Sequence, residues 1–498
     1  MSVKVRKLGI WWVAPLLSMA AFAGTGSDVR LVDAAKNRDH EAVRSLLKQH
    51  VDVNTPQADG ATALAWAAHW DDVETADLLI RAGANVNAAN SYGVTPLSLA
   101  CTNQNAAMVE KLLKAGADPN GVPTGTPVLM TAARTGNMDT VKSLLAHGAD
   151  VNAKEGARGQ TALMWAVAEK HPELVRVLIE HGADVHLHST SGFTPLLFAA
   201  QQGDMDSARM LLEAGANANE AAPEDGSALI VATQSGHEAL ALFLLEKGAD
   251  PNAADAYGIT SLHYALLKGL ARVSGVRPIS GAGYLYRPNM PELVKALLAH
   301  GANPNARIVK FPPMPNTRMF KAIDLTPVGA TPFLLAAASY DAGIMRMLAA
   351  KGADPLLTDQ AKNTPLIMAA GFAEGITHAV ERPQQDDRDA LEAVRAAVEL
   401  GGDVNATNDI GDTAIHGAAY VGANDIVQFL VEKGAKVDAE NVYGQTAWTI
   451  AAEVMTPGLA KDKDLRPRNS HQNTADLLVK LGAKPLAEPG AQGANVAP

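Results

Sequence analysis

Closely spaced histidines are the first residues in this sequence that could do chemistry. His186 and His188 alternate in "DVHLHS", shortly after His181. Alternate histidines in an extended segment can ligate a metal. The ligand set is incomplete, however, because neither a cysteine nor a second histidine pair lies nearby, and His186 falls at a turn position of a recurring phrase. We therefore expect no metal site and no cofactor.

A second candidate for chemistry combines carboxylates and a histidine at helical spacing. Glu374, His378 and Glu381 stand at i, i+4 and i+7, so they could share one face of a helix. The sequence contains no Gly-x-Ser-x-Gly elbow, Walker phosphate loop or HExxH motif. We expect no catalytic residues and no enzymatic activity. The alternative is an enzyme, or an effector directed at a host cell, with a site built from insertions in the C-terminal half.

The composition limits the classes of protein to which this chain can belong. The chain has 498 residues, of which 47% are hydrophobic and 19% charged, and its formal net charge is -11. This is enough apolar material for a sizeable core. The acidic balance disfavours nucleic acid and anionic membranes as partners. Because Cys101 is the only cysteine, no disulfide forms within the chain and packing must supply the stability.

The first 23 residues have the three-part pattern of a secretory signal peptide. A basic segment precedes the apolar residues 8–20, and small residues flank the cleavage position; the residues concerned are Lys4, Arg6, Lys7, Ala21 and Ala23. The apolar run is short for a membrane span, although an uncleaved anchor remains the alternative. We expect a periplasmic or secreted protein with no membrane span after signal removal.

Two short phrases recur along the rest of the chain. The first is "GADVN" and its variants, which begin at 83, 116, 148, 182, 215, 248, 301, 352, 401, 434 and 482. The second is "TPLLFAA" and its variants, for example at 62, 95, 161, 194 and 227. The regular step of both is 33 residues. Each interval reads as two short helices and a turn that cannot bury their apolar faces alone, so neighbouring units must stack.

One unit, residues 194–219, shows how the local sequence predicts the helices. Thr194 is suited to cap the first helix, and Pro195 suits its first position. Gly203 and Asp204 should end that helix and start the second one. The second helix buries Leu211 and its neighbours, and Gly215 can end it in a left-handed conformation.

The period of 33, the Thr-Pro-Leu phrase and the "GADVN" turns resemble the ankyrin repeat family. The resemblance implies an all-α repeat solenoid of about twelve stacked helix-turn-helix units joined by β-hairpin fingers. We assign residues 24–486 to this array, 28–54 to an N-terminal cap and 487–498 to a disordered tail. The family's histidine, which ties adjacent loops together, is kept only at His263 and His416.

Longer steps place four insertions, at 269–290, 306–327, 371–388 and 453–472. The second enlarges one finger, 307–327, and has the composition of a partner-binding patch; its candidate residues are Phe311, Met314, Arg318, Phe320 and Lys321. The other three are basic, acidic and basic in turn. They either brace one another as solvated loops or form a binding edge.

The family resemblance places fingers and first helices on a concave groove that grips partners. Trp66, Trp165, Phe198 and Tyr264 share one helix position that we expect to pack between repeats. Our candidates for the groove are His69, Trp70, Arg134, Gln201, Gln202 and Gln234, with Tyr92, Phe193, Tyr257 and Tyr443 on the fingertips. We expect a monomer that binds another protein; a purely structural envelope scaffold is the remaining alternative.

Overall fold

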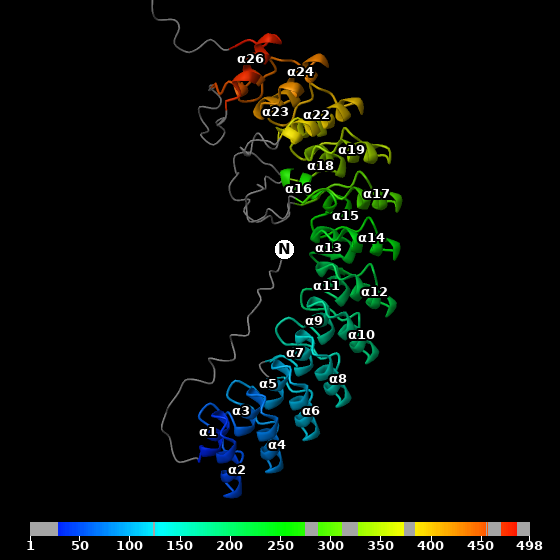
Figure 1. Cartoon of the computed structure of the whole chain (residues 1–498). Helices are drawn as coiled ribbons and strands as arrows, with labels where there is room; N and C mark the ends of the chain where they lie inside the picture. Colours follow the sequence, from blue (N-terminus) through cyan, green and yellow to red (C-terminus); the bar gives the residue numbers. More distant parts are fainter. Residues whose placement is uncertain are drawn as a thin grey trace, which may run out of the picture. The chain divides into compact units, whose positions relative to one another are not determined.

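The chain is built from pairs of short α-helices. The computed structural model describes residues 28–122, 125–273, 287–310, 327–372, 384–454, 456 and 470–485. Within these ranges the chain divides into two compact units between Ala222 and Pro223. In each unit the first helices contact one another in one layer and the second helices in another, as Figure 1 shows. The predicted all-α repeat solenoid is confirmed.

The described residues of the first unit form six helix pairs. Its first helices are α1 (Arg30–Lys36), α3 (Ala63–His69), α5 (Pro96–Thr102), α7 (Val128–Thr135), α9 (Ala162–Ala168) and α11 (Pro195–Gln202). Its second helices are α2 (His40–Lys48), α4 (Val73–Arg81), α6 (Ala106–Lys114), α8 (Met138–Ala146), α10 (Pro172–Glu180) and α12 (Met205–Glu213). A two-residue strand, β1 (Ala221–Ala222), follows α12.

The second unit is less regular. It begins with the strand β2 (Gly226–Ser227) and its first-helix layer comprises α13 (Ala228–Ser235), α15 (Ser261–Tyr264), α16 (Leu267–Val273), α18 (Pro332–Ala338), α20 (Pro365–Ala369), α23 (Ala414–Tyr420) and α25 (Ala447–Ala451). Its second-helix layer comprises α14 (Glu238–Glu246), α17 (Pro291–Ala299), α19 (Ala342–Ala349), α22 (Gln384–Glu399), α24 (Asn424–Glu432) and α26 (Gln472–Lys480).

Side-chain caps explain where the helices start. The backbone N–H of Leu197 donates to Thr194 Oγ1 at 3.4 Å, and Pro195 occupies the first turn of α11. The helix ends at Gly203, whose φ of 68° is left-handed, and Asp204 caps α12. Leu211 of α12 is completely buried, with 0% of its surface exposed. The helix boundaries predicted for this unit are confirmed.

Most of the described fingers are hydrogen-bonded turns rather than the β-hairpins expected from the resemblance. In one of them the N–H of Asn90 donates to the carbonyl oxygen of Val94 at 3.0 Å, and Gly93 N–H donates to Asn90 at 2.9 Å. The fingertip is so short that one hydrogen bond closes it, and little room is left for the further hydrogen bonds of a paired strand. Successive tips are also joined, as where Ser91 N–H donates to the carbonyl of Asp59 at 2.8 Å.

The last residue of the "GADVN" phrase bridges neighbouring repeats. The Asn54 carboxamide donates to the Gly83 carbonyl at 3.2 Å and accepts from the Asn85 N–H at 2.7 Å. Equivalent pairs of bonds are made by Asn87, Asn120, Asn152, Asn252, Asn305 and Asn405. One side chain thus satisfies two backbone groups at the end of a second helix, where carbonyls lack partners within the helix.

Three described repeats have another residue in place of this asparagine. Asp438 still accepts from the Lys484 N–H at 2.9 Å, whereas His186 and Leu356 depart from the pattern. His186 Nδ1 lies 2.8 Å from Glu220 Oε1, so the bridge there becomes a side-chain pair. Leu356 is exposed, and a leucine side chain can make no such bond.

Candidate protein-binding surface

The C-terminal ends of the first helices hold most of the predicted groove residues. Trp70 and Arg134 are exposed there, whereas His69, Gln201, Gln202 and Gln234 are half-buried. These residues stand seven or eight positions after the cap, on the last turn of each first helix. The structure therefore brings the predicted residues of the first unit to equivalent positions in alternate repeats, at the ends of α3, α7 and α11.

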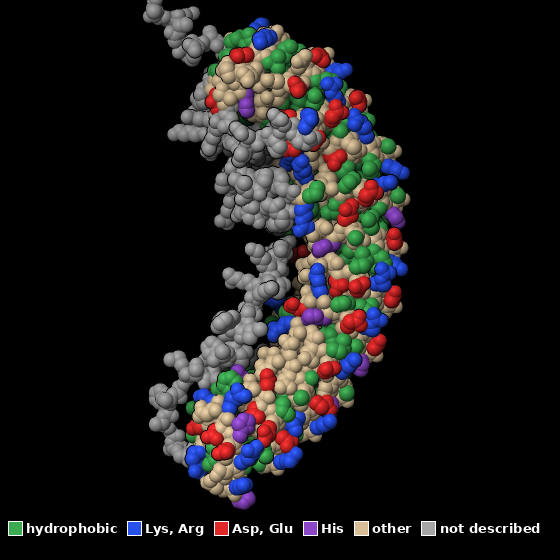
Figure 2. Space-filling model, viewed as in Figure 1, with side chains coloured by type: hydrophobic (Ala, Val, Ile, Leu, Met, Phe, Trp, Pro, Cys, Tyr) green, Lys and Arg blue, Asp and Glu red, His purple; other side chains and the backbone are tan. Residues whose placement is uncertain are grey.

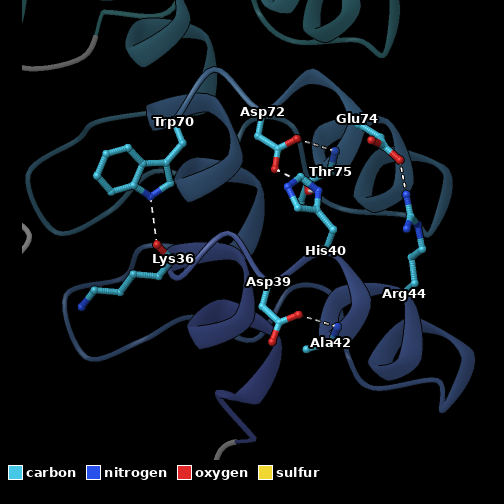
Figure 3. A network of polar contacts seen from close by, with 9 residues as sticks. All are labelled: Lys36, Asp39, His40, Ala42, Arg44, Trp70, Asp72, Glu74 and Thr75. Atoms are coloured by element: carbon cyan, nitrogen blue, oxygen red, sulfur yellow. Dashed lines mark hydrogen bonds and ion pairs between the residues drawn. The ribbon is translucent and has the colours of Figure 1, made fainter.

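An aromatic cluster lies at the end of α3. Trp66 stacks with Trp70 at 6.3 Å between ring centroids, and His69 contacts both rings edge-on at 5.5 and 4.6 Å. Figure 3 shows the Trp70 indole N–H donating to the Lys36 carbonyl oxygen of the preceding repeat, at 3.0 Å. Burial lowers the pKa of His69, which favours its neutral form. The cluster is a fixed aromatic surface, because rings and backbone hold Trp70 while 42% of it stays exposed.

Two tryptophans contact cations from the preceding repeat. The Lys36 ammonium lies 5.1 Å from the Trp66 ring centroid, and the Arg134 guanidinium lies 5.7 Å from that of Trp165. Trp66 is buried, with 4% exposed, and Trp165 is half-buried. The prediction that this helix position packs between repeats is confirmed for these two residues. The sequence interpretation did not single out Lys36, although its position in the repeat matches that of Arg134.

The fingertip candidates differ in exposure. Tyr92 is 47% exposed, and Tyr257 and Tyr443 are half-buried. Phe193 is only 8% exposed and packs edge-on against Phe198 at 5.4 Å. Its assignment to the binding surface is wrong, because the ring turns inward to cover the first helix of its own repeat.

A polar cluster in the second unit joins finger residues Asp225 and Asp255 to side chains of α13 and α15. The Tyr264 hydroxyl donates to Asp255 Oδ2 at 2.7 Å and lies 3.5 Å from Gln234 Nε2. Burial, with the nearby Asp225 as a smaller cause, raises the pKa of Asp255; burial likewise raises the pKa of Asp225. Gln234 is therefore part of a polar network as well as a surface residue.

The enlarged finger keeps the geometry of the shorter ones at its base. The Ile308 N–H donates to the Ala330 carbonyl at 3.2 Å, and Val309 N–H donates to the Tyr257 carbonyl at 2.9 Å. Gln360 N–H donates to the Val328 carbonyl at 2.9 Å, which joins the next finger. The extra residues thus enter between Val309 and Val328. The predicted binding residues of this finger lie outside the described residues and are Phe311, Met314, Arg318, Phe320 and Lys321.

Two of the other insertions contact each other through an ion pair. Arg272 lies within α16, donates to the Ala338 carbonyl at 2.9 Å and pairs with Asp386 of α22 at 3.2 Å. Its guanidinium also lies over the Tyr340 ring at 4.1 Å. These contacts agree with insertions that brace one another.

The expectation of solvated loops, however, is wrong at both residues. Arg272 is buried, and the acidic segment that contains Asp386 forms the start of α22, where its carboxylates favour a helix N-terminus.

The candidate metal and catalytic residues do not form a site in the described part of the chain. His186 pairs with Glu220, which raises its pKa, and no group of three or more potential ligands is found among the described residues. Glu374, His378 and Glu381 lie outside those residues. Cys101 is buried, which raises the pKa of its thiol to about 12 and disfavours the reactive thiolate.

Comparison with known proteins identifies the repeat. The family model described as ankyrin repeats (3 copies) matches residues 31–123, 121–189, 196–277 and 376–488. Among solved structures, the human ASB11 ankyrin repeat domain is 30% identical, with a TM-score of 0.39, over 43% of this chain and 96% of that one. The ankyrin repeat domain of Bcl-3, of the IkappaB protein family, is 26% identical, with a TM-score of 0.39, over 42% and 95%. Ankyrin repeats are protein–protein interaction modules. Because the family model matches most of its length, the chain belongs to the ankyrin repeat family.

Proposed function

We propose that this protein is a non-catalytic, monomeric scaffold that binds another protein through its first-helix ends and fingers. One observation carries the proposal. Among the described residues, most large apolar side chains that remain exposed lie on these two features: Trp70, Tyr92, Val122, Val309 and Val442. Exposed aromatic and apolar side chains on a fixed backbone are typical of protein interfaces.

The second-helix layer of the first unit has a different character. Acidic and basic side chains alternate over it (Figure 2), and several pair across repeats. Lys111 Nζ lies 2.6 Å from Asp77 Oδ1, and Arg44 pairs with Glu74 as drawn in Figure 3. Groups that are already paired offer less to a partner, which favours the first-helix ends and fingers as the binding surface.

The backbone supports such a surface without large rearrangement. Caps fix the helix starts, and hydrogen bonds join successive fingers, so residues such as Tyr92 project from an ordered frame. A preorganised surface loses little conformational entropy on binding. We include the enlarged finger, 307–327, in the proposed site on the strength of its sequence.

We further propose that the protein is exported to the periplasm or secreted. The support is the leader pattern that ends at Ala21 and Ala23, in residues outside the described ranges. No helix among the described residues is long and apolar enough to cross a membrane. Mass spectrometry of the envelope and secreted fractions should find a chain that begins after Ala23, and an intact leader would contradict cleavage.

Site-specific photo-crosslinking tests the binding surface. A photoreactive phenylalanine analogue at Trp70, Tyr92 or Tyr257 should capture the same partner protein in stoichiometric amounts from the native fraction. The matched controls carry the analogue at Lys48 or Lys142, which are exposed on second helices. Equal capture from both sets, or capture from neither, would contradict the proposed surface.

The contribution of the enlarged finger has a separate test. Replacing residues 310–326 by a short glycine-containing turn should leave folding intact, because the hydrogen bonds of Ile308, Pro327 and Val328 lie outside the replaced segment. Partner capture should weaken. Unchanged affinity would remove the finger from the site.

A further inference from the structure

We propose that the first unit binds an extended acidic polypeptide segment through two equivalent pairs of residues, Lys36 with Trp66 and Arg134 with Trp165. The proposal rests on the proposed function, because it names the chemistry of a partner for the same surface. We call each combination an indole–cation pair.

The two pairs occupy the same positions of the repeat. Lys36 and Arg134 each lie seven positions after the N-cap residue of their helix, which is Val29 for α1 and Pro127 for α7. Trp66 and Trp165 are each the fourth residue after a threonine cap, in α3 and α9. In both cases the cation comes from one repeat and the indole from the next. The surface thus presents one recognition element twice.

Both indoles have a hydrogen-bond donor without an acceptor. The Nε1–H groups of Trp66 and Trp165 are buried and find no acceptor in the part of the chain that the structure describes. The neighbouring Trp70 differs, because its N–H donates to the Lys36 carbonyl. Leaving a buried donor unpaired is costly. An oxygen supplied by a partner would remove that cost, and the indole therefore favours a ligand with an acceptor.

The charges beside the indoles select an acidic ligand. Lys36 and Arg134 are both exposed, and within the described ranges neither forms an ion pair, whereas Lys111 and Arg44 on the second helices are paired. Long basic side chains change rotamer readily. A carboxylate can therefore draw the cation off the ring and open a path to the indole N–H. Cation and N–H would then bind the same acidic group.

The spacing of the pairs selects an extended ligand. The first helices α3, α5, α7 and α9 contact one another in sequence, so three helix steps separate the two indoles. At about 8–10 Å per step, the pairs lie roughly 24–30 Å apart. An extended chain advances about 3.3 Å per residue. Two acidic residues about seven to nine positions apart would reach both pairs at once.

Synthetic peptides test this prediction on the full chain. The main probe is a fluorescein-labelled peptide with glutamates nine positions apart on a Gly-Ser spacer, and the comparison peptides carry one glutamate or two lysines. Fluorescence anisotropy should show the two-glutamate peptide binding about tenfold more tightly than the one-glutamate peptide, since the second contact is intramolecular. The two-lysine peptide should bind more weakly than either.

Variants assign the binding to the two pairs. Lys36→Gln and Arg134→Gln should each reduce the two-glutamate peptide to the affinity of the one-glutamate peptide, whereas Lys142→Gln on α8 should change nothing. Trp66→Phe and Trp165→Phe keep a ring and remove the donor, and should also weaken binding. In spectra of 15N-tryptophan protein, the indole signals of Trp66 and Trp165 should shift on binding, and that of Trp70 should not.

Equal binding of the acidic and basic peptides, or unchanged binding in both glutamine variants, would overturn the proposal. Its failure is distinguishable from that of the proposed function. If acidic peptides do not bind but crosslinks from Trp70 and Tyr92 still capture a partner, the indole–cation pairs lose their assigned role and the binding surface stands. If both fail, the surface itself is wrong.

Discussion

The two units hold their repeats together in different ways. In the first, surface ion pairs such as the exposed Arg44 with Glu74 and the half-buried Lys111 with Asp77 link second helices, in addition to the apolar core. In the second, buried polar side chains link successive fingers. Asn408 donates to Asn363 Oδ1 at 3.0 Å, and Asn441 donates to Asp412 Oδ1 at 2.8 Å.

The difference follows the regularity of the sequence. Where every step is close to 33 residues, each repeat meets an almost identical neighbour, and the same apolar contacts and asparagine bridges recur at each junction. Insertions interrupt the second unit, and there the buried Arg272 and the finger asparagines make contacts that only one alignment satisfies. Buried polar groups add little net stability, but they can specify a unique arrangement. We infer that the second unit uses them for alignment.

The largest expected effect comes from breaking the buried ion pair. Arg272→Met should cost about 3–5 kcal/mol, because it removes the buried hydrogen bond to the Ala338 carbonyl and leaves Lys268, at 3.7 Å, as the cation beside Asp386. Denaturant unfolding would measure the loss, and hydrogen exchange should place it in α16, α18 and α22. Replacing both partners, with Asp386→Leu added, should restore much of the stability. A single substitution that costs less than about 1 kcal/mol would contradict a buried, coupled pair.

Removing a core side chain in the first unit should have a comparable or smaller effect. Leu211→Ala should cost about 2–5 kcal/mol through lost burial and the cavity left behind. Because repeats contact mainly their neighbours, hydrogen exchange should accelerate in α10 and α12 before α2 and α4. Glu213→Ala on the exposed face of α12 is the control. Uniform acceleration through the unit would show that its repeats do not respond locally.

A pH-dependent difference should be smaller and confined to the second unit. Burial raises the pKa of Asp359 to about 6, so the folded state holds this proton more tightly than the unfolded state. The resulting stabilisation is present below about pH 4 and is lost as pH rises through 6. The free energy of unfolding of Asp359→Asn, relative to that of the wild type, should therefore increase by at most about 3 kcal/mol between pH 4 and pH 7. A difference that stays constant with pH would refute this.

The smallest effect should come from an exposed ion pair of the first unit. Arg44→Gln should cost less than about 1 kcal/mol, because Arg44 and Glu74 are both well exposed. The difference should disappear in 1 M salt, where exposed charges are screened. Thermal unfolding at low and high salt would measure it. A loss of stability as large as that of Arg272→Met would contradict the proposed difference between the two units.

The repeated phrases predicted most of the fold because each contains the residues that start and end its own helices. Thr194, Pro195 and Gly203 act as caps and end residues within their own helix, so their roles can be derived from short sequence windows. The same is true of His263, whose Nε2 lies 3.1 Å from the Ala306 carbonyl of the next finger. Burial lowers its pKa to about 4, consistent with a neutral structural link.

The sequence could not predict contacts between residues that lie far apart along the chain. Arg272 and Asp386 meet because α16 and α22 each include part of an insertion, 269–290 and 371–388, whose local structure no repeat phrase predicts. Phe193 was misjudged because a fingertip residue can turn either way, and only packing against Phe198 decides. Lys36 could have been predicted as a surface residue, because aligning the sequence of α1 with that of α7 places Lys36 at the same position as Arg134.

The exposed Leu356 has a mechanical consequence. Asparagine bridges such as that of Asn305 to Gly352 tie the end of one repeat to the next, and these bonds would carry load if the ends of the second unit were pulled apart. Leucine contributes no such tie between α19 and the repeat that follows. A pulling force at this junction would therefore fall on other contacts, such as the ion pair of Arg346 with Glu399 and the bond from Asn408 to Asn363.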